Sequence, residues 1–175
     1  LDGVKPGSDT AGPHLIVTPL AVLQNWVNEI KRFTPQLSYA KVHGSVSERA
    51  RVLGNDEVVS GGFDVYLTTY DTLLAEEAFF TEAFLFHTVV IDEGHRLKSA
   101  TSKLCGGLSR LTTPFRVLLT GTPLQNCLDE LWALLCYVLP TALDGKRSRV
   151  ARTFEGAESE TAIDLTRVTQ ARHLL

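Results

Sequence analysis

The stretch TVVIDEGH, residues 88–95, places two adjacent carboxylates, Asp92 and Glu93, directly behind an apolar run. A short apolar run of this kind predicts a buried strand, and we expect that strand over residues 88–92. Four further segments also predict strands, namely residues 14–18 (HLIVT), 37–43, 63–68 (FDVYLT) and 115–120 (FRVLLT). Strands that are apolar over most of their length are typical of a sheet covered on both faces.

Segments with helical spacing separate these strands. The first carries its apolar residues at Leu20, Leu23, Val27, Ile30 and Phe33, which predicts one buried helix face. Further helices are expected over residues 45–53, 70–86 with a break, 99–111 weakened by Gly106-Gly107, and 126–139. Strand and helix in alternation predict a doubly wound, mostly parallel α/β sheet. Ligands of such sheets bind at the carboxyl ends of the strands.

The composition fits one soluble domain and excludes several classes. The chain has 175 residues, 17 Lys+Arg against 20 Asp+Glu, and 44% hydrophobic residues, which argues against a disordered chain or a wholly basic nucleic-acid coat protein. We see neither a signal peptide nor an apolar run of the roughly 18–20 residues that span a bilayer, so no membrane partner is expected. The odd set Cys105, Cys127 and Cys136 indicates reduced thiols in an intracellular protein.

The chain divides into three stretches that differ in composition and periodicity. Residues 1–13 are rich in Gly, Pro, Ser, Thr and Asp and predict a loop or linker, and residues 14–140 carry the strand–helix alternation. Residues 141–175 have weak periodicity and predict a protruding, partly helical appendage. The sequence contains no methionine, and we therefore expect it to be a piece of a longer protein.

The acid pair has a chemical interpretation and a structural one. Two neighbouring carboxylates at a strand end repel each other unless a cation is present. A Mg²⁺ ion with nucleotide phosphates removes that repulsion, so that one acid holds the metal and the other activates water. The alternative is a surface turn in which both acids are solvated.

Three other predicted strand ends carry polar residues that are compatible with two interpretations. Residues 118–126 read LLTGTPLQN, residues 16–20 read IVTPL, and residues 68–71 read TTYD. Hydroxyls and free N–H groups at such positions bind phosphate or contact a neighbouring lobe. Each segment is also compatible with an ordinary strand–turn–helix junction with a cap. Trp26 and Trp132 are expected to pack in the core or against a lobe.

The series of motifs resembles the first motor lobe of SWI/SNF-type chromatin-remodelling ATPases, which belong to helicase superfamily 2. TPLAVLQNW, TTYD, DEGHRLK, LLTGTPLQN and DELWALLCYVLP follow one another between residues 14 and 140. The resemblance implies an ATP-binding, RecA-like P-loop NTPase lobe with a DEAH-like box, acting in the nucleus as a hydrolase with helicase-type motifs. The expected cofactors are ATP and Mg²⁺.

The resemblance implies roles at the ATP site. Asp92 is expected to hold Mg²⁺, through water, and Glu93 to activate the hydrolytic water. His95 is expected to help couple nucleotide state to the rest of the motor. Thr120, Gly121, Thr122 and Gln125 are expected to link the ATP site to DNA binding and to lobe closure.

The resemblance also implies DNA contacts. Thr18, Pro19 and Leu20 are expected to lie along one DNA strand, as are Thr69 and Tyr70. His43 and Gly44, with nearby Arg49, are expected to add a phosphate contact. The implied partners are double-stranded DNA and nucleosomes, a second motor lobe of the same protein, and subunits of a remodelling complex. Residues 141–175 match the place of a protrusion towards that second lobe.

The sequence departs from the family pattern in one important respect. The phosphate-cradling G-x-x-x-x-G-K-[ST] loop is missing, so the expected fold lacks its N-terminal phosphate-loop strand and helix. That strand is expected beside the strand of the acid pair, where its loss would expose an unpaired edge. We expect this piece alone to be inactive and unstable or sticky.

Two other functions stay open from the sequence. One is a strand-separating helicase or RNA-dependent ATPase of the same superfamily, and the other is a non-catalytic binding module that lacks the phosphate loop. Our hypothesis is a fragment of an ATP-dependent double-stranded-DNA translocase of the chromatin-remodelling type.

Overall fold

A computed structural model describes residues 12–83, 85–97, 103–121 and 134–140. The elements follow in the order β1 (His14–Thr18), α1 (Leu20–Phe33), β2 (Tyr39–Val42), α2 (Val46–Leu53), α3 (Asp56–Val59), β3 (Val65–Thr69), α4 (Tyr70–Ala75), α5 (Glu77–Glu82), β4 (Thr88–Ile91), the 3₁₀ helix η1 (Gly94–Leu97), α6 (Lys103–Arg110) and β5 (Phe115–Leu118). Residues 134–138 are also helical. No helix in these four ranges has the length and apolarity to cross a membrane.

The five strands form one parallel sheet in the order β2-β3-β1-β4-β5. The predicted parallel α/β fold is therefore confirmed. Val17 of β1 pairs with Ile91 of β4, and Ile91 pairs with Leu118 of β5. This register brings the carboxyl ends of β1, β4 and β5 to one edge, which positions the acid pair beside the residues that follow β1 and β5.

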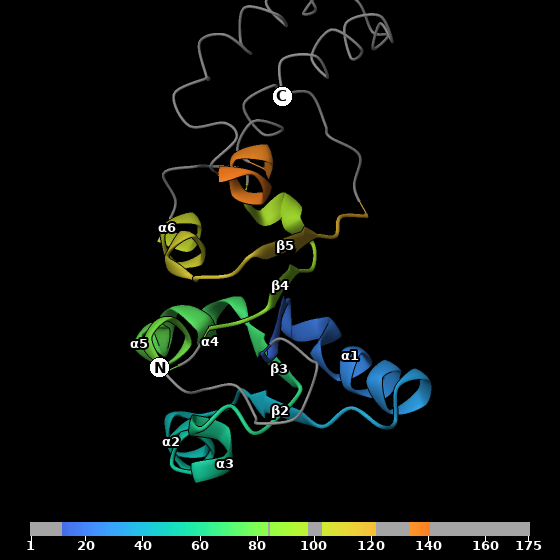
Figure 1. Cartoon of the computed structure of the whole chain (residues 1–175), viewed down its shortest axis with the longest axis vertical. Helices are drawn as coiled ribbons and strands as arrows, with labels where there is room; N and C mark the ends of the chain where they lie inside the picture. Colours follow the sequence, from blue (N-terminus) through green and yellow to red (C-terminus); the bar gives the residue numbers. More distant parts are fainter. Residues whose placement is uncertain (1–11, 84, 98–102, 122–133, 141–175) are drawn as a thin grey trace, which may run out of the picture.

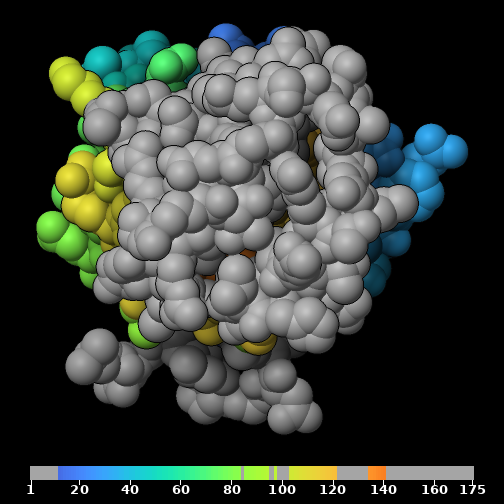
Figure 2. Space-filling view, turned by 90° about the horizontal axis from the view of Figure 1, so that it is seen from above, coloured from blue at the N-terminus to red at the C-terminus, as the bar shows by residue number. Residues whose placement is uncertain are grey.

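Helices cover both faces of the sheet (Figure 1). On β1, Ile16 packs with Leu23 and Val27 of α1, whereas Leu15 and Val17 belong to the cluster on the other face. This alternation follows from the two-residue period of a strand. Figure 2, viewed from above, also shows α1 in blue on one flank and α6 in yellow on the opposite flank. Among the described helices, α1 therefore covers one face and the others pack on the opposite face.

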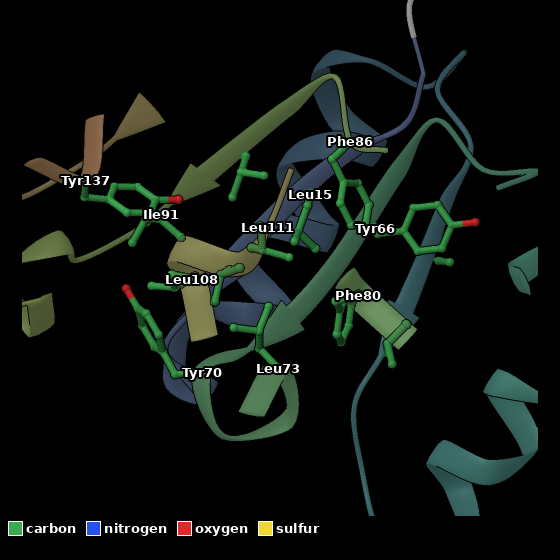
Figure 3. Close-up of a cluster of buried hydrophobic side chains, with 14 of the residues drawn as sticks. Leu15, Tyr66, Tyr70, Leu73, Phe80, Phe86, Ile91, Leu108, Leu111 and Tyr137 are labelled. Atoms are coloured by element: carbon green, nitrogen blue, oxygen red, sulfur yellow. The ribbon is translucent and has the colours of Figure 1, made fainter. Parts of the chain in front are cut away.

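The larger core cluster is built around aromatic side chains (Figure 3). Tyr66 is fully buried, and its ring lies edge-on to that of Phe86 with centroids 5.9 Å apart. The Tyr66 hydroxyl donates to the carbonyl oxygen of Val58 at 2.7 Å, so its polar end is satisfied inside the core. Burial of this phenol raises its pKa to about 12, and the ring therefore stays neutral at physiological pH.

Side-chain caps explain where α2 and α3 begin. Ser45 begins α2 with a capping box, in which its side chain accepts from the backbone N–H of Glu48 while the Glu48 carboxylate accepts from the backbone N–H of Ser45. The short helix α3 was missed by the sequence analysis, although Asn55 caps it through the N–H groups of Glu57 and Val58. A four-residue helix is too short for a visible apolar period.

The predicted apolar face of α1 is wrong at both of its ends. Leu23, Val27 and Ile30 are buried, but Leu20 is 61% exposed and Phe33 is 65% exposed. Both residues occupy terminal positions of the helix, where the sheet no longer lies beneath it. The Phe33 ring instead lies under the guanidinium of Arg32, whose central carbon is 5.0 Å from the ring centroid.

The expected place of a missing strand is also wrong. β4 pairs with β1 on one side and with β5 on the other, so a further strand could not pair with the strand of the acid pair. Within the described sheet, β2 and β5 are the strands with a single neighbour. The backbone groups expected to be unpaired beside Asp92 are occupied by β1 and β5.

Several sequence-based expectations lie outside the described residues. They concern the linker over residues 1–11, the helical segments 99–102 and 126–133, the appendage 141–175, and the residues Thr122, Gln125, Cys127 and Trp132. Cys105 and Cys136, which are described, are buried and half-buried, respectively.

Two adjacent glycines in α6 provide a first test of the fold. A Cβ at Gly106 would meet nothing within 4 Å, whereas a Cβ at Gly107 would lie 2.8 Å from Cδ2 of Leu74. We expect Gly106→Ala to stabilise α6 by about 0.5–1 kcal/mol, because alanine loses less backbone entropy in a helix. Gly107→Ala should gain less, because the end of the Leu74 side chain must move to make room for the new Cβ. Hydrogen exchange of the α6 amides in the full-length protein measures both, and equal effects of the two substitutions would contradict this packing.

Candidate active site

Asp92 lies at the carboxyl end of β4, and three donors surround its carboxylate. Its backbone N–H continues the sheet ladder to the carbonyl of Val17 at 2.9 Å. Oδ2 accepts hydrogen bonds from the indole Nε1 of Trp26 at 2.8 Å and from Oγ1 of Thr18 at 3.1 Å. Oδ1 accepts from the backbone N–H of Glu93 at 2.9 Å. The carboxylate is therefore fixed in orientation by β1, α1 and its own turn.

Glu93 adopts a left-handed backbone conformation with φ of 55°. Among residues other than glycine this region is sparsely populated, and it stores about 1–3 kcal/mol of strain that the surroundings must hold. The conformation turns the chain sharply after β4. The Glu93 side chain is half-buried, and its Oε2 atom is shielded from solvent. Strain of this kind is concentrated at functional sites.

Gly94 connects the acid pair to the segment after β5. Its backbone N–H donates to the carbonyl of Leu119 at 2.8 Å, and the N–H of Leu119 donates to the carbonyl of Ile91 at 2.8 Å. These two bonds extend the β4–β5 ladder past the strand ends. The exposed Thr120 and Gly121 follow directly. Two of the predicted site segments, DEGH and LLTG, are thus in direct contact through the backbone.

The Thr18–Leu20 segment splits between the interior and the surface. Thr18 is fully buried, and its hydroxyl is the one that contacts Asp92. Pro19 precedes the first residue of α1 and offers no side-chain acceptor to the first N–H groups of that helix. Leu20 is exposed. The start of α1, which no side chain caps, therefore follows directly on the Thr18 contact to Asp92.

The Thr69–Tyr70 junction faces inwards. Both side chains are 3% exposed. The Tyr70 hydroxyl donates to the backbone carbonyl of Asp92, and Thr69 Oγ1 donates to Oγ1 of Thr72 at 3.0 Å. Because both side chains are buried, an external ligand could contact this junction only through its backbone groups.

His43 and Gly44 lie beside that junction. His43 Nδ1 is 3.2 Å from Oγ1 of Thr72 and 3.5 Å from Oγ1 of Thr69. Gly44 has φ of 126°, which favours glycine. Arg49 donates from Nη1 to the carbonyl of Gly44 at 2.8 Å and pairs through Nε with Glu76 at 2.6 Å. Its charge is already compensated within the domain.

The predicted site residues therefore form two groups. Asp92, Glu93, Thr18 and Tyr70 converge on the carboxyl end of β4, and Thr120 with Gly121 follows through the Leu119 contact. His43, Gly44 and Thr69 lie further along the same edge. His95 lies in η1, and its side chain, like Thr122 and Gln125, is outside the described set.

Trp26 is the member of the site that the sequence analysis missed. It was predicted to pack, and it does pack against the cluster of Ile16, Leu23 and Val27. Its indole N–H nevertheless points to Asp92. The sequence did contain a signal for this contact. Trp26 carries a hydrogen-bond donor and lies on the helix that directly follows Thr18, the last residue of β1.

Asp92 and Glu93 fit a hard divalent cation. Two carboxylates offer about four lone-pair positions each, and Oδ2 of Asp92 already accepts two hydrogen bonds. Oδ1 accepts a single hydrogen bond within the described part of the chain, so one lone pair remains for a cation or its water. Mg²⁺ is bound in this way, by one or two carboxylates, several waters and nucleotide phosphates.

The sheet order and the acidic carboxyl edge together define a RecA-like α/β lobe. The chain belongs to the SNF2-related domain family, whose model matches residues 2–170. A mouse protein, "Chromodomain-helicase-DNA-binding protein 1-like", is 47% identical over 129 residues, which cover 74% of this chain and 14% of that protein. An Arabidopsis thaliana protein, "ISWI chromatin-remodeling complex ATPase CHR11", is 43% identical over 129 residues, or 74% of this chain and 12% of that protein.

A solved structure supports the same fold. The "Sulfolobus solfataricus SWI2/SNF2 ATPase core in complex with dsDNA" is similar with a TM-score of 0.71 and 27% identity, over 93% of this chain and 32% of that chain. The present chain spans only a small part, 14% and 12%, of the two curated relatives. The activity of a whole protein is therefore a separate question from the family of this domain.

Proposed function

We propose that this domain is part of the first motor lobe of an ATP-dependent translocase on double-stranded DNA, of the chromatin-remodelling type. The observation that carries the proposal is the junction at Asp92. Its carboxylate contacts Thr18 and Trp26, and the neighbouring Gly94 contacts Leu119. Three motif segments that are distant in sequence therefore meet at the acidic turn, as a site that links nucleotide chemistry to movement requires.

ATP and Mg²⁺ are the proposed ligands of the acid pair. Asp92 would hold Mg²⁺, through water, with its remaining Oδ1 lone pair, and the ion would supply positive charge against the nucleotide phosphates. Glu93 would orient the attacking water and accept its proton. The left-handed backbone at Glu93 supports this role, because strained backbone of this kind is concentrated at functional sites.

The segments around the acid pair would carry the coupling. Thr120, Gly121, Thr122 and Gln125 follow β5, and the first of them is one residue beyond the Leu119 carbonyl that Gly94 contacts. Movement of the acidic turn would therefore reach this loop directly. His95, immediately after Gly94, would respond to the same movement.

DNA would bind along the carboxyl edge through phosphate contacts. The start of α1, after Thr18-Pro19-Leu20, has no side-chain cap, and a helix start of this kind favours an anion. Thr69 and Tyr70 would contribute backbone groups, since their side chains are buried, and His43 and Gly44 would extend the same track. Contacts of this kind position a protein on DNA and carry little sequence preference.

The remaining partners follow from the relatives. A second motor lobe would complete the ATP site, and nucleosomes and remodelling-complex subunits are the proposed partners in the nucleus. On this proposal the domain alone is inactive, because it lacks the phosphate-loop motif and the second lobe.

The test is ATP turnover by the full-length protein with different nucleic acids. Duplex DNA should stimulate turnover more than single-stranded DNA or RNA, and the protein should displace a third strand from a DNA triplex without separating the duplex. The apparent DNA affinity should fall steeply with salt, because phosphate contacts release counterions. Stimulation by RNA, or duplex unwinding, would instead support a strand-separating helicase. Failure to bind ATP would support a non-catalytic module.

A further inference from the structure

Trp26 occupies an unusual place for a core aromatic residue. Its ring packs against the α1 face of the sheet, beside Val27 and Leu23. Its Nε1 atom donates to Oδ2 of Asp92 at 2.8 Å, which lies within the usual range of an N–H···O hydrogen bond. The two residues are 66 positions apart, so the contact depends on how α1 docks on the sheet.

The contact determines which oxygen of Asp92 is available. Trp26 and Thr18 together fill the two lone pairs of Oδ2, whereas Oδ1 accepts only the N–H of Glu93 within the described residues. If the indole N–H were removed, Oδ2 would have an unfilled lone pair and the carboxylate could rotate about its Cβ–Cγ bond. The orientation of Oδ1 would then no longer be fixed.

We propose that Trp26 is a positioning residue for the metal-binding carboxylate. Its indole N–H holds Oδ2 so that Oδ1 faces the nucleotide's Mg²⁺. This inference rests on the proposed function, in which Asp92 binds Mg²⁺ with ATP. It adds a residue outside the acid pair that sets the affinity for the metal.

Two substitutions on α1 distinguish this role from simple packing. Val27 is the neighbour of Trp26 on α1, is 3% exposed, and belongs to the same cluster. Val27→Ala removes two methyl groups from the same cluster and leaves the Trp26 donor to Asp92 in place. Trp26→Phe keeps an aromatic ring and removes the donor. A packing role predicts similar results for the two variants, and a positioning role predicts different ones.

The experiment measures Mg²⁺ affinity by nucleotide binding in the full-length protein. A fluorescent ATP analogue is titrated into Trp26→Phe, Val27→Ala and the unmodified protein, first in EDTA and then at a series of Mg²⁺ concentrations. We expect Trp26→Phe to raise the Mg²⁺ concentration for half-maximal effect by about tenfold, as the loss of partners that orient a metal ligand does. Its affinity for the analogue in EDTA should be unchanged, and Val27→Ala should match the unmodified protein in both conditions.

An isosteric replacement strengthens the test. Benzothienylalanine at position 26 keeps the bicyclic shape of tryptophan and replaces the N–H by sulfur, so it should reproduce the effect of Trp26→Phe. An unchanged Mg²⁺ dependence in Trp26→Phe, or an equal shift in Val27→Ala, would overturn the inference.

Asp92→Asn distinguishes this inference from the proposed function. If Asp92→Asn weakens the Mg²⁺ effect and Trp26→Phe does not, the positioning role fails and the proposed metal site stands. If Asp92→Asn leaves the Mg²⁺ effect unchanged, both fail together.

Discussion

Glu93→Gln in the full-length protein should lower the rate of DNA-stimulated ATP hydrolysis by about 10²–10⁴-fold, the usual contribution of a general base. Glutamine keeps the size of the side chain and its place in the turn, and it cannot take a proton from water at neutral pH. ATP affinity and duplex-DNA affinity should remain close to those of the unmodified protein. Single-turnover hydrolysis, with separate titrations of ATP and of DNA, measures the three quantities.

A matched control removes the same charge elsewhere. Glu82, at the end of α5, is exposed, and Glu82→Gln should leave hydrolysis unchanged. The substitution should also leave the backbone turn intact, because glutamine and glutamate adopt the φ of 55° found at position 93 with similar ease. Near-normal turnover by Glu93→Gln would refute the role of this residue, and a loss of ATP binding would indicate a folding defect instead.

Much of the fold could be predicted because the local signals agreed with one another. The strand over residues 14–18 and the helix that follows have the predicted bounds, since β1 runs from His14 to Thr18 and α1 begins at Leu20. The predicted break in the helix over residues 70–86 appears as separate helices α4 and α5. In each case apolar spacing and the neighbouring polar residues pointed the same way.

The order of strands could not be predicted from such signals. Alternation of strands and helices implies parallel pairing and does not say which strands are neighbours. β4 lies between β1 and β5, and the expected vacancy beside it was wrong for that reason. The order depends on the fit of whole helices over the sheet, which no short segment contains.

The acid pair could be predicted, and its surroundings could not. A carboxylate pair after an apolar strand is visible in eight residues of sequence, TVVIDEGH. The partners of Asp92 are 74, 66 and 22 positions away, at Thr18, Trp26 and Tyr70. Tyr70 was expected along DNA, and its hydroxyl is directed to the Asp92 carbonyl because α4 starts at the same sheet edge.

Gly94→Ala should destabilise the junction of β4 and β5 towards the upper end of the about 1–3 kcal/mol usual for overpacking. A Cβ at this position would lie 2.4 Å from both Cγ and Cδ2 of Leu118. Overlap with Cγ cannot be relieved by moving a methyl group alone, so the Leu118 side chain or the β5 backbone must shift. That shift would strain the bond from the Gly94 N–H to the Leu119 carbonyl. Hydrogen exchange of the β4 and β5 amides in the full-length protein measures the loss.

A double-mutant cycle tests whether overlap with Leu118 causes the loss of stability in Gly94→Ala. Leu118→Ala removes the overlapping atoms, so Gly94→Ala in that background should cost much less than in the unmodified protein, and residues in contact commonly couple by about 0.5–3 kcal/mol. Gly106→Ala, whose new Cβ meets nothing within 4 Å, is the control for glycine replacement itself. Additive effects of Gly94→Ala and Leu118→Ala would contradict the contact. Strong coupling would mean that the acidic turn packs directly on the LLTG segment, where the same glycine that approaches Leu118 also bonds to Leu119.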